Sequence, residues 1–154
     1  MLDPACGSGA FLNEVFDCLY REGQTINYEL TRLSGGQAHL FKWDTHILKN
    51  NIFGVDINKE SVELTKLGLW IKTANRNEKL TYLDDNIRCG NSLIDDPSVS
   101  GELAFKCEEE FNEIMKKGCF DVVVGNPPYL RIQGLKEHYK EETLFIESNY
   151  KSAT

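Results

Sequence analysis

Long apolar runs, paired cysteines and an excess of basic residues are all absent from this sequence of 154 residues. No segment approaches the roughly 18 uninterrupted apolar residues of a membrane-spanning helix, so no membrane attachment is expected. No charged-then-apolar leader opens the chain, and export is not expected either. The three histidines form no ligand pattern, and no two cysteines form a CxxC pair. A reduced, cytoplasmic protein without a structural metal is therefore predicted; its five cysteines are Cys6, Cys18, Cys89, Cys107 and Cys119.

The charge balance is acidic, with a net charge of −7 at pH 7. Neutralising nucleic-acid phosphates requires clustered Lys and Arg, so this chain by itself is not expected to bind nucleic acid strongly. The balance still allows a nucleic-acid enzyme whose basic surface lies on another domain. The length and the 41% of hydrophobic residues suit one globular domain with its own core.

Strand and helix patterns alternate in the first half of the chain. A short strand at Leu2 leads through a glycine-rich turn into a helix with apolar residues at helical spacing, Phe11, Leu12, Val15, Phe16 and Leu19. Residues 24–50 are polar and predict an irregular insertion with one or two short helices. The segment "NIFGVDI" then predicts a buried strand ending at Asp56. Asn58 can cap the next helix, whose apolar stripe is Leu67, Trp70, Ile71 and Ala74.

The alternation continues in the second half. A third short strand is predicted around residues 87–90, followed by a loop at 95–101 and a helix that carries Phe111, Ile114 and Met115. The run "CFDVVVG" predicts a fourth strand buried on both faces, and no further element is expected after Tyr129. This order predicts an α/β fold with a doubly wound, mostly parallel sheet, whose ligands bind at the carboxyl ends of the strands. Every unusual stretch lies at such an end, which predicts a single site.

The first unusual stretch is the turn "DPACGSGAF". Gly7 and Gly9 allow positive φ and close approach of a ligand, and the helix that follows points its free N–H groups at the same place. An ordinary tight strand–helix turn would look similar. Leu12 replaces the third glycine of the dinucleotide-binding pattern, so a nucleoside ligand without pyrophosphate fits better than a dinucleotide.

Two further residues favour such a ligand. Asp56 ends the second strand, where a carboxylate can accept both hydroxyls of a ribose, although a solvated carboxylate at a strand end is the alternative. Asn91, in "CGNSLI", offers a donor and an acceptor to an adenine edge, although Asn-Ser after Gly is also a common turn.

The most distinctive stretch is "VVVGNPPYLR". Pro127 and Pro128 have no N–H and stiffen the strand exit, which leaves carbonyl oxygens and the side-chain oxygen of Asn126 as an array of acceptors. Two acceptors that grip an exocyclic NH₂ group would free its lone pair, and Tyr129 could stack on a base extruded from its duplex. A Pro-Pro loop that only ends a strand is the simpler alternative.

Taken together, these stretches resemble the motifs of S-adenosylmethionine-dependent DNA amino-methyltransferases, especially the adenine-N6 type. "DPACGSGAFL" resembles motif I of that family, "FGVDI" motif II, "GNSLI" motif III and "DVVVGNPPY" the catalytic motif IV, in family order over residues 2–129. The similarity extends to large type IIG restriction–methylation enzymes and related phage-defence methyltransferases. It implies a Rossmann-like class I methyltransferase fold.

The resemblance also implies roles for individual residues. Asp3 and the backbone of Pro4, Ala5, Cys6, Gly7 and Gly9 would hold the methionine part of S-adenosylmethionine. Asp56 would take the ribose, with Ile57 against the adenine, and Asn91 stands where the family often has Asp. Asn126 and the Pro127 carbonyl would accept the target N–H bonds, with Pro128 stiffening the loop and Tyr129 stacking. Methyl transfer to adenine N6 in double-stranded DNA would be direct.

Departures from the family pattern predict a truncated piece of a larger enzyme. Residues 1–154 would form part of the catalytic domain, with the first four strands and the insertion at about 24–50, and without a target-recognition domain. An open apolar sheet edge would then favour self-association of the fragment. Two rivals remain, a methyltransferase acting on protein glutamine or RNA and a non-catalytic scaffold module with the same fold.

Overall fold

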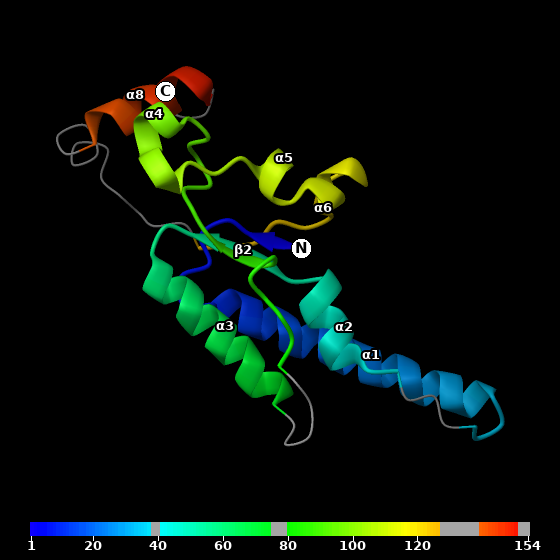
Figure 1. Ribbon diagram of the computed structural model, residues 1–154. Coiled ribbons are helices and arrows are strands. Elements are labelled where there is room, and N and C mark those ends of the chain that lie inside the picture. Colours follow the sequence, from blue (N-terminus) through cyan, green and yellow to red (C-terminus); the bar gives the residue numbers. More distant parts are fainter. Residues whose placement is uncertain (38–40, 75–79, 127–138, 151–154) are drawn as a thin grey trace.

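The computed structural model describes residues 1–37, 41–74, 80–126 and 139–150. Three short parallel strands lie at its centre, in the spatial order β1 (Leu2–Asp3), β2 (Phe53–Asp56) and β3 (Ile87–Cys89). Figure 1 shows helices on both sides of these strands: α1, α2 and α3 lie below them, and α4, α5, α6 and α8 lie above. The predicted parallel α/β architecture is confirmed to that extent.

The described helices differ widely in length. They are α1 (Ala10–Leu33), α2 (Trp43–Asn50), α3 (Lys59–Thr73), α4 (Pro97–Ser100), the 3₁₀ helix η1 (Gly101–Leu103), α5 (Cys107–Glu110), α6 (Asn112–Lys116) and α8 (Lys140–Asn149). Only α1 and α3 are long, and they run side by side beneath the sheet (Figure 1).

Strand β2 is apolar on both faces because each face packs into its own core. Phe53 and Val55 belong to a core above the sheet, with Phe105 and Phe111. On the other face, the absence of a side chain at Gly54 lets α1 approach closely: a Cβ there would lie 2.8 Å from a Leu12 methyl group. The core below the sheet consists of Cys6, Leu12, Phe16, Ile47, Leu48, Ile52, Val62, Leu69, Leu83 and Ile87.

The fourth predicted strand is present only as an isolated bridge. Leu2 and Val123 pair in parallel, with Leu2 N–H donating to the Val122 carbonyl and Val124 N–H to the Leu2 carbonyl, both at 2.9 Å. The prediction that this run is buried on both faces is wrong for the described chain, because Val122 and Val123 are 44% and 61% exposed. Strand β1 has only two residues, so it offers too few backbone groups for a longer ladder.

The segment 24–50 is more regular than its polarity predicted. Helix α1 continues to Leu33 instead of ending near residue 23, and one short helix, α2, follows. The absence of a side chain at Gly23 lets the Trp43 ring of α2 pack against α1, since a Cβ there would lie 2.4 Å from that ring. Asn27 secures the same contact by accepting from Trp43 Nε1 at 3.1 Å and donating to the Phe41 carbonyl at 3.1 Å.

Helix α3 buries a different face from the predicted one. Asn58 caps it as expected, accepting from Ser61 N–H at 2.8 Å. Its buried residues, however, are Val62, Thr65, Lys66 and Leu69, which are also spaced i, i+3, i+4 and i+7. Leu67 and Ile71 of the predicted stripe are 50% and 67% exposed, whereas Trp70 of that stripe packs against the core below the sheet. Hydrophobicity pointed to the wrong stripe because the polar groups of Thr65 and Lys66 find partners when buried.

Three smaller expectations also need correction. The loop predicted at 95–101 contains α4, whose first residue is Pro97. Asp96 caps this helix, because its side chain accepts from Ser98 N–H at 2.8 Å. The helix predicted around residues 111–115 is split into α5 and α6, because Phe111 between them has non-helical backbone angles (φ −113°, ψ 39°). The Phe111 ring packs in the core above the sheet. After Tyr129, where no element was expected, the structure has α8.

Candidate cofactor site at the carboxyl edge of the sheet

The glycine-rich turn between β1 and α1 has the conformation that its sequence demands. Gly7 and Gly9 both have positive φ, 54° and 82°. Gly9 N–H donates to the Cys6 carbonyl at 2.8 Å, which closes the turn, and Gly9 forms the N-cap of α1. A Cβ at Gly9 would lie 2.8 Å from Thr65 of α3, so only glycine fits here on grounds of both conformation and space.

Asp56 is bonded directly to this turn. Its Oδ2 accepts from Gly7 N–H at 2.8 Å, and its Oδ1 accepts from Asn58 N–H at 2.9 Å. The Cys6 N–H donates to the Val55 carbonyl at 2.9 Å, so the turn follows the end of β2 closely. Each carboxylate oxygen keeps one lone pair for a ligand. The structure therefore brings Asp56 and the turn together, as the sequence predicted.

Asp3 lies beneath the same turn and is 1% exposed. Its Oδ1 accepts from Ala5 N–H at 3.1 Å. Burial raises the pKa of Asp3 above the ordinary aspartate value, the Ala5 hydrogen bond opposes that rise, and the charge of Asp56 adds to it. Two carboxylates in one place favour a cationic ligand.

The exit of the 119–125 segment reaches this point as well. A Cβ at Gly125 would lie 2.7 Å from Asp3 Oδ1, so the backbone passes against that carboxylate. Asn126 follows directly and is exposed. The structure thus brings Asn126 to the same edge as Asp3. Pro127, Pro128 and Tyr129 lie outside the described residues.

Asn91 begins the segment that leaves β3. Its N–H donates to the Leu103 carbonyl at 2.6 Å, and its Oδ1 accepts from Leu93 N–H at 3.2 Å. The neighbouring Ser92 hydroxyl donates to the Pro4 carbonyl at 2.7 Å, which ties this segment to the turn. Asn91 therefore lies on the predicted edge, with a side chain that also stabilises its own loop.

The remaining candidates differ in exposure. Cys6 is buried, and burial together with the nearby Asp56 and Asp3 charges raises the pKa of its thiol to about 12. It contributes packing and backbone to the turn rather than a thiolate. Ile57 is 52% exposed and offers an apolar surface beside Asp56.

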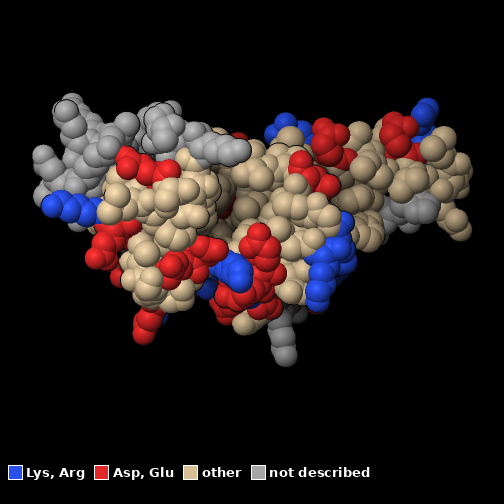
Figure 2. All heavy atoms as spheres, turned by 90° about the horizontal axis from the view of Figure 1, so that it is seen from above, with Lys and Arg blue, Asp and Glu red and all other residues tan. Residues whose placement is uncertain are grey.

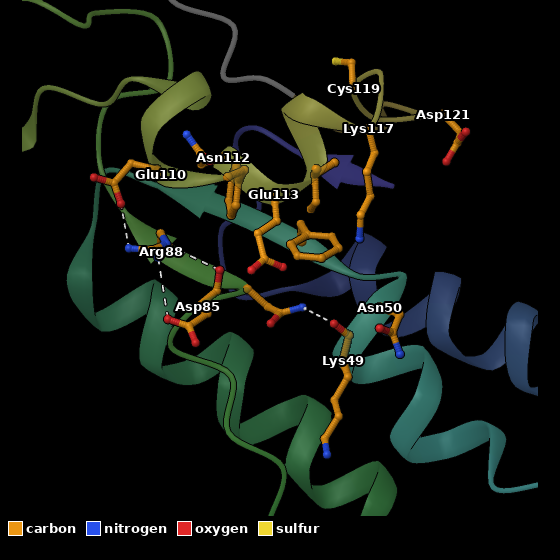
Figure 3. A pocket seen from close by; sticks show the side chains of 14 residues that line it. Lys49, Asn50, Asp85, Arg88, Glu110, Asn112, Glu113, Lys117, Cys119 and Asp121 are labelled. Carbon is orange, nitrogen blue, oxygen red and sulfur yellow. Dashed lines mark hydrogen bonds and ion pairs between the residues drawn. The ribbon is translucent and has the colours of Figure 1, made fainter.

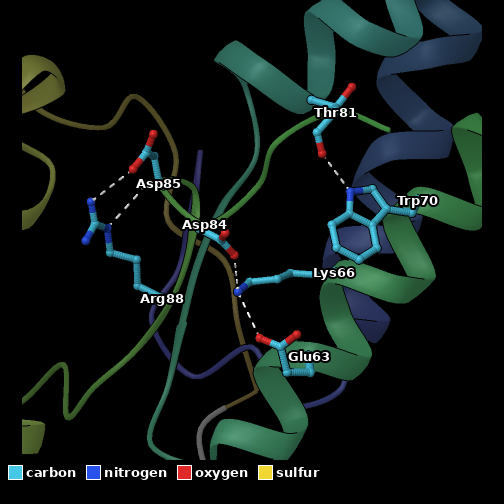
Figure 4. A network of polar contacts seen from close by, with 7 residues as sticks. All are labelled: Glu63, Lys66, Trp70, Thr81, Asp84, Asp85 and Arg88. Carbon is cyan, nitrogen blue, oxygen red and sulfur yellow. Dashed lines mark hydrogen bonds and ion pairs between the residues drawn. The ribbon is translucent and has the colours of Figure 1, made fainter. Parts of the chain in front are cut away.

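A buried lysine fixes the loop that leads into β3 (Figure 4). Lys66 of α3 contacts Asp84 Oδ1 at 2.5 Å and Glu63 Oε1 at 2.9 Å, and Trp70 Nε1 donates to the Thr81 carbonyl at 2.7 Å. Burial alone would lower the pKa of Lys66, but the bonds and charges of the two carboxylates raise it above the ordinary lysine value. These contacts fix the position of α3 relative to the loop that leads into β3.

A cavity of about 740 Å³ opens at the other end of the strands (Figure 3). It contains none of the predicted site residues. Its lining includes Phe53, the first residue of β2, and Asn86, the residue before β3. The cavity therefore lies at the amino ends of these strands. Arg88 is bonded to Glu110 at 2.6 Å, and Asn86 Nδ2 donates to the Leu48 and Ile52 carbonyls. Its size does not make it the candidate site, because these polar groups already have structural partners.

Figure 2 shows one face of the molecule, on which acidic side chains occur in several groups and basic ones form no continuous stripe. That distribution agrees with the net charge of −7. None of the described helices combines the length and the apolar character that crossing a bilayer requires.

Sequence reasoning overlooked two residues that shape the site, Thr65 and Ser92. Thr65 is fully buried on α3, and its Oγ1 donates to the Gly7 carbonyl at 2.9 Å. No signal in the sequence marked Thr65, because the stripe predicted for α3 was centred on Leu67 and Ile71, which are exposed. Ser92 carried a usable signal, since it stands directly beside Asn91 at a strand end.

The fold and this edge define an α/β protein with a glycine turn and two carboxylates at the carboxyl ends of adjacent parallel strands. Comparison with known sequences identifies the family. Residues 50–154 match the model of the Eco57I restriction-modification methylase family, and the chain belongs to that family.

Individual relatives match almost the whole chain. Over 98% of its own length, the chain is 31% identical to the type II restriction enzyme and methyltransferase RM.Eco57I of Escherichia coli. It is 27% identical to DNA methyltransferase A of Bacillus subtilis over 97%, and 26% identical to the adenine-specific methyltransferase PglX of Streptomyces coelicolor over 92%. The chain spans only 16%, 17% and 13% of these relatives' own lengths.

Proposed function

We propose that this chain is the cofactor-binding and catalytic-loop part of a DNA methyltransferase that methylates adenine N6 in double-stranded DNA, within a restriction-modification or phage-defence system. The observation that carries the proposal is the meeting of Asp3, Asp56 and the Gly7–Gly9 turn at one edge, with the chain entering Asn126 beside them. Membership of the methylase family and similarity to an adenine-specific enzyme support it. A cytoplasmic location, where cellular DNA lies, follows from this function.

The full fold proposed is a Rossmann-like class I methyltransferase with a doubly wound, mostly parallel sheet. The segment 120–125 would be its fourth strand beside β1, as the parallel Leu2–Val123 bridge supports. Residues 1–154 would form part of the catalytic domain, with a helical insertion at about 24–50. Target recognition would reside in another part of the natural protein.

The residues at this edge suit S-adenosylmethionine. This molecule carries a ribose and two cationic groups, and Asp56 and Asp3 supply carboxylates with free lone pairs. Ile57 and Asn91 stand at the rim, where an adenine would find an apolar face and a polar edge. The backbone from Pro4 to Gly9 would wrap the methionine part. Bound there, the cofactor supplies an electrophilic methyl group.

The catalytic loop would act on the other reactant. The side-chain oxygen of Asn126 and the Pro127 carbonyl would accept the two N–H bonds of the target amine, which favours a tetrahedral nitrogen with an available lone pair. Pro128 would keep that carbonyl rigid, and Tyr129 would stack on the flipped base. The N–C bond forms as the S–C bond breaks, and the amine proton leaves to solvent. The rate would come from positioning and polarisation.

The test is transfer of radiolabelled methyl by the natural full-length protein to duplex DNA, RNA and protein, with the methylated product identified by mass spectrometry. N6-methyladenine in duplex DNA is expected. Asn126→Ala should lower kcat by about 10²-fold or more and leave cofactor affinity nearly unchanged. Asn112→Ala, at an exposed amide of α6, is the matched control and should change neither.

A second arm tests the ribose contact by titration calorimetry. Asp56→Ala should weaken S-adenosylmethionine binding by roughly 1.5–3 kcal/mol, because charged hydrogen bonds are lost. Asp96→Ala is matched, since Asp96 also accepts from the N–H two residues further on. Methylation of RNA or protein alone would overturn the DNA assignment. Cofactor binding without transfer to any substrate would favour a scaffold module.

A further inference from the structure

Two hydroxyl groups grip the glycine turn from outside. Thr65 Oγ1, on α3, donates to the Gly7 carbonyl at 2.9 Å. Ser92 Oγ, beyond β3, donates to the Pro4 carbonyl at 2.7 Å. The two donors come from segments far apart in the sequence, and they hold two carbonyls of the same short turn. The turn is therefore fixed by the tertiary structure as well as by its own glycines.

Holding a carbonyl also orients the next N–H, because the two point in opposite directions across a trans peptide, and no described peptide bond is cis. The peptide after Pro4 directs the Ala5 N–H to Asp3 Oδ1. The peptide after Gly7 turns the Ser8 N–H away from α3. Within the described residues this N–H has no hydrogen-bond partner, and Ser8 is exposed. It is a donor ready for a ligand oxygen.

Thr65 has little freedom to do anything else. Its side chain is fully buried, and the position of a Cβ at Gly9 would lie 2.8 Å from its methyl group and 2.9 Å from its hydroxyl. A buried hydroxyl must find a partner within the protein, and the Gly7 carbonyl is that partner. The contact therefore holds the turn in one conformation before any ligand arrives.

We infer that Thr65 and Ser92 are positioning residues of the S-adenosylmethionine site: they lock the Gly7 and Pro4 peptides so that the Ser8 N–H, Asp3 and Asp56 are arranged for the cofactor in advance. This inference rests on the proposed function. Without the two hydroxyls the turn samples other peptide orientations, and binding must select the competent one. The apparent Kd then equals the intrinsic Kd divided by the fraction of time that the turn is competent.

The experiment uses the natural full-length protein and S-adenosylmethionine in titration calorimetry. Thr65→Val and Ser92→Ala remove only the hydroxyls, and each should raise Kd roughly 2- to 12-fold, the factor of one ordinary neutral hydrogen bond. Thr65→Ser and Ser92→Thr restore the hydroxyls and should recover most of the affinity. In steady-state assays the KM for S-adenosylmethionine should rise by a similar factor, with kcat and the KM for DNA within about twofold.

Controls of the same kind exist in the chain. Thr73→Val removes a hydroxyl on α3 that donates to the Trp70 carbonyl at 3.3 Å, and Ser98→Ala removes one bonded to Asp96. Neither should change Kd. Unchanged affinity in both Thr65→Val and Ser92→Ala, a loss that the conservative variants do not rescue, or an equal loss in Thr73→Val would overturn the inference while leaving the proposed function intact. If Thr65→Val does not fold, the two Ser92 variants decide. A wild-type protein that binds no S-adenosylmethionine would overturn both.

Discussion

Replacing Gly9 by alanine tests whether the Thr65 side chain leaves room only for glycine at this position of the turn. At φ 82° an alanine pays about 1–2 kcal/mol for the left-handed conformation, partly offset by about 0.4–1 kcal/mol from a less flexible unfolded chain. Its Cβ would also lie 2.8–3.1 Å from three atoms of the buried Thr65, and such overpacking adds about 1–3 kcal/mol. Gly9→Ala should therefore lower the free energy of unfolding by roughly 2–4 kcal/mol.

Gly7 provides the comparison that separates the two contributions. It also has positive φ, yet apart from Gly7 itself and its two chain neighbours no described atom lies within 4 Å of the position of its Cβ. Gly7→Ala should therefore show only the conformational part, about 1 kcal/mol. Urea unfolding followed by fluorescence of Trp43 and Trp70 measures both variants, since both rings pack against the lower core.

A double-mutant cycle measures the coupling between Gly9 and Thr65. Thr65→Ala removes two of the three crowding atoms, so Gly9→Ala should be at least about 1 kcal/mol less destabilising in that background. Equal destabilisation by Gly7→Ala and Gly9→Ala, or additivity in the cycle, would refute the claim that Thr65 limits the space around the turn.

Two other expectations concern pH and association. Because the folded state raises the pKa of Asp3 above its ordinary 3.8, the folded chain keeps a proton that the unfolded chain releases. The contribution of Asp3 to the free energy of unfolding should therefore fall as pH rises through the window between the two pKa values and stay level above it. Asp3→Asn should flatten that slope in urea titrations at several pH values, and equal slopes would contradict the assignment. The exposed Val122 and Val123 should let the 154-residue chain self-associate in sedimentation experiments, and Val123→Lys should shift it towards monomer; a monomeric wild-type chain would argue against an open edge.

The sequence by itself determined much of the site. The two positive-φ glycines, the strand that ends at Asp56 and the cap at Asn58 are all local features, and each follows from residue type and spacing. A parallel sheet then brings strand ends to one edge because its strands all point the same way. The meeting of Asp3 and Asp56 could therefore be predicted without coordinates. The roles of Asn126 and the residues after it remain predictions.

Only the tertiary structure decided which faces are buried. The stripe of α3 that contains Leu67 and Ile71 is the more hydrophobic one, yet the helix buries Thr65 and Lys66 because the Gly7 carbonyl, Asp84 and Glu63 satisfy their polar groups. The valine run at 122–124 reads as a buried strand, yet in the described residues it forms an isolated bridge to Leu2, with Val122 and Val123 exposed. The Gly7 carbonyl lies 58 residues from Thr65 and Asp84 lies 18 residues from Lys66, so local hydrophobicity and propensity carry no record of these partners. The hydroxyls that fix the glycine turn belong to the same category and became visible only in the folded chain.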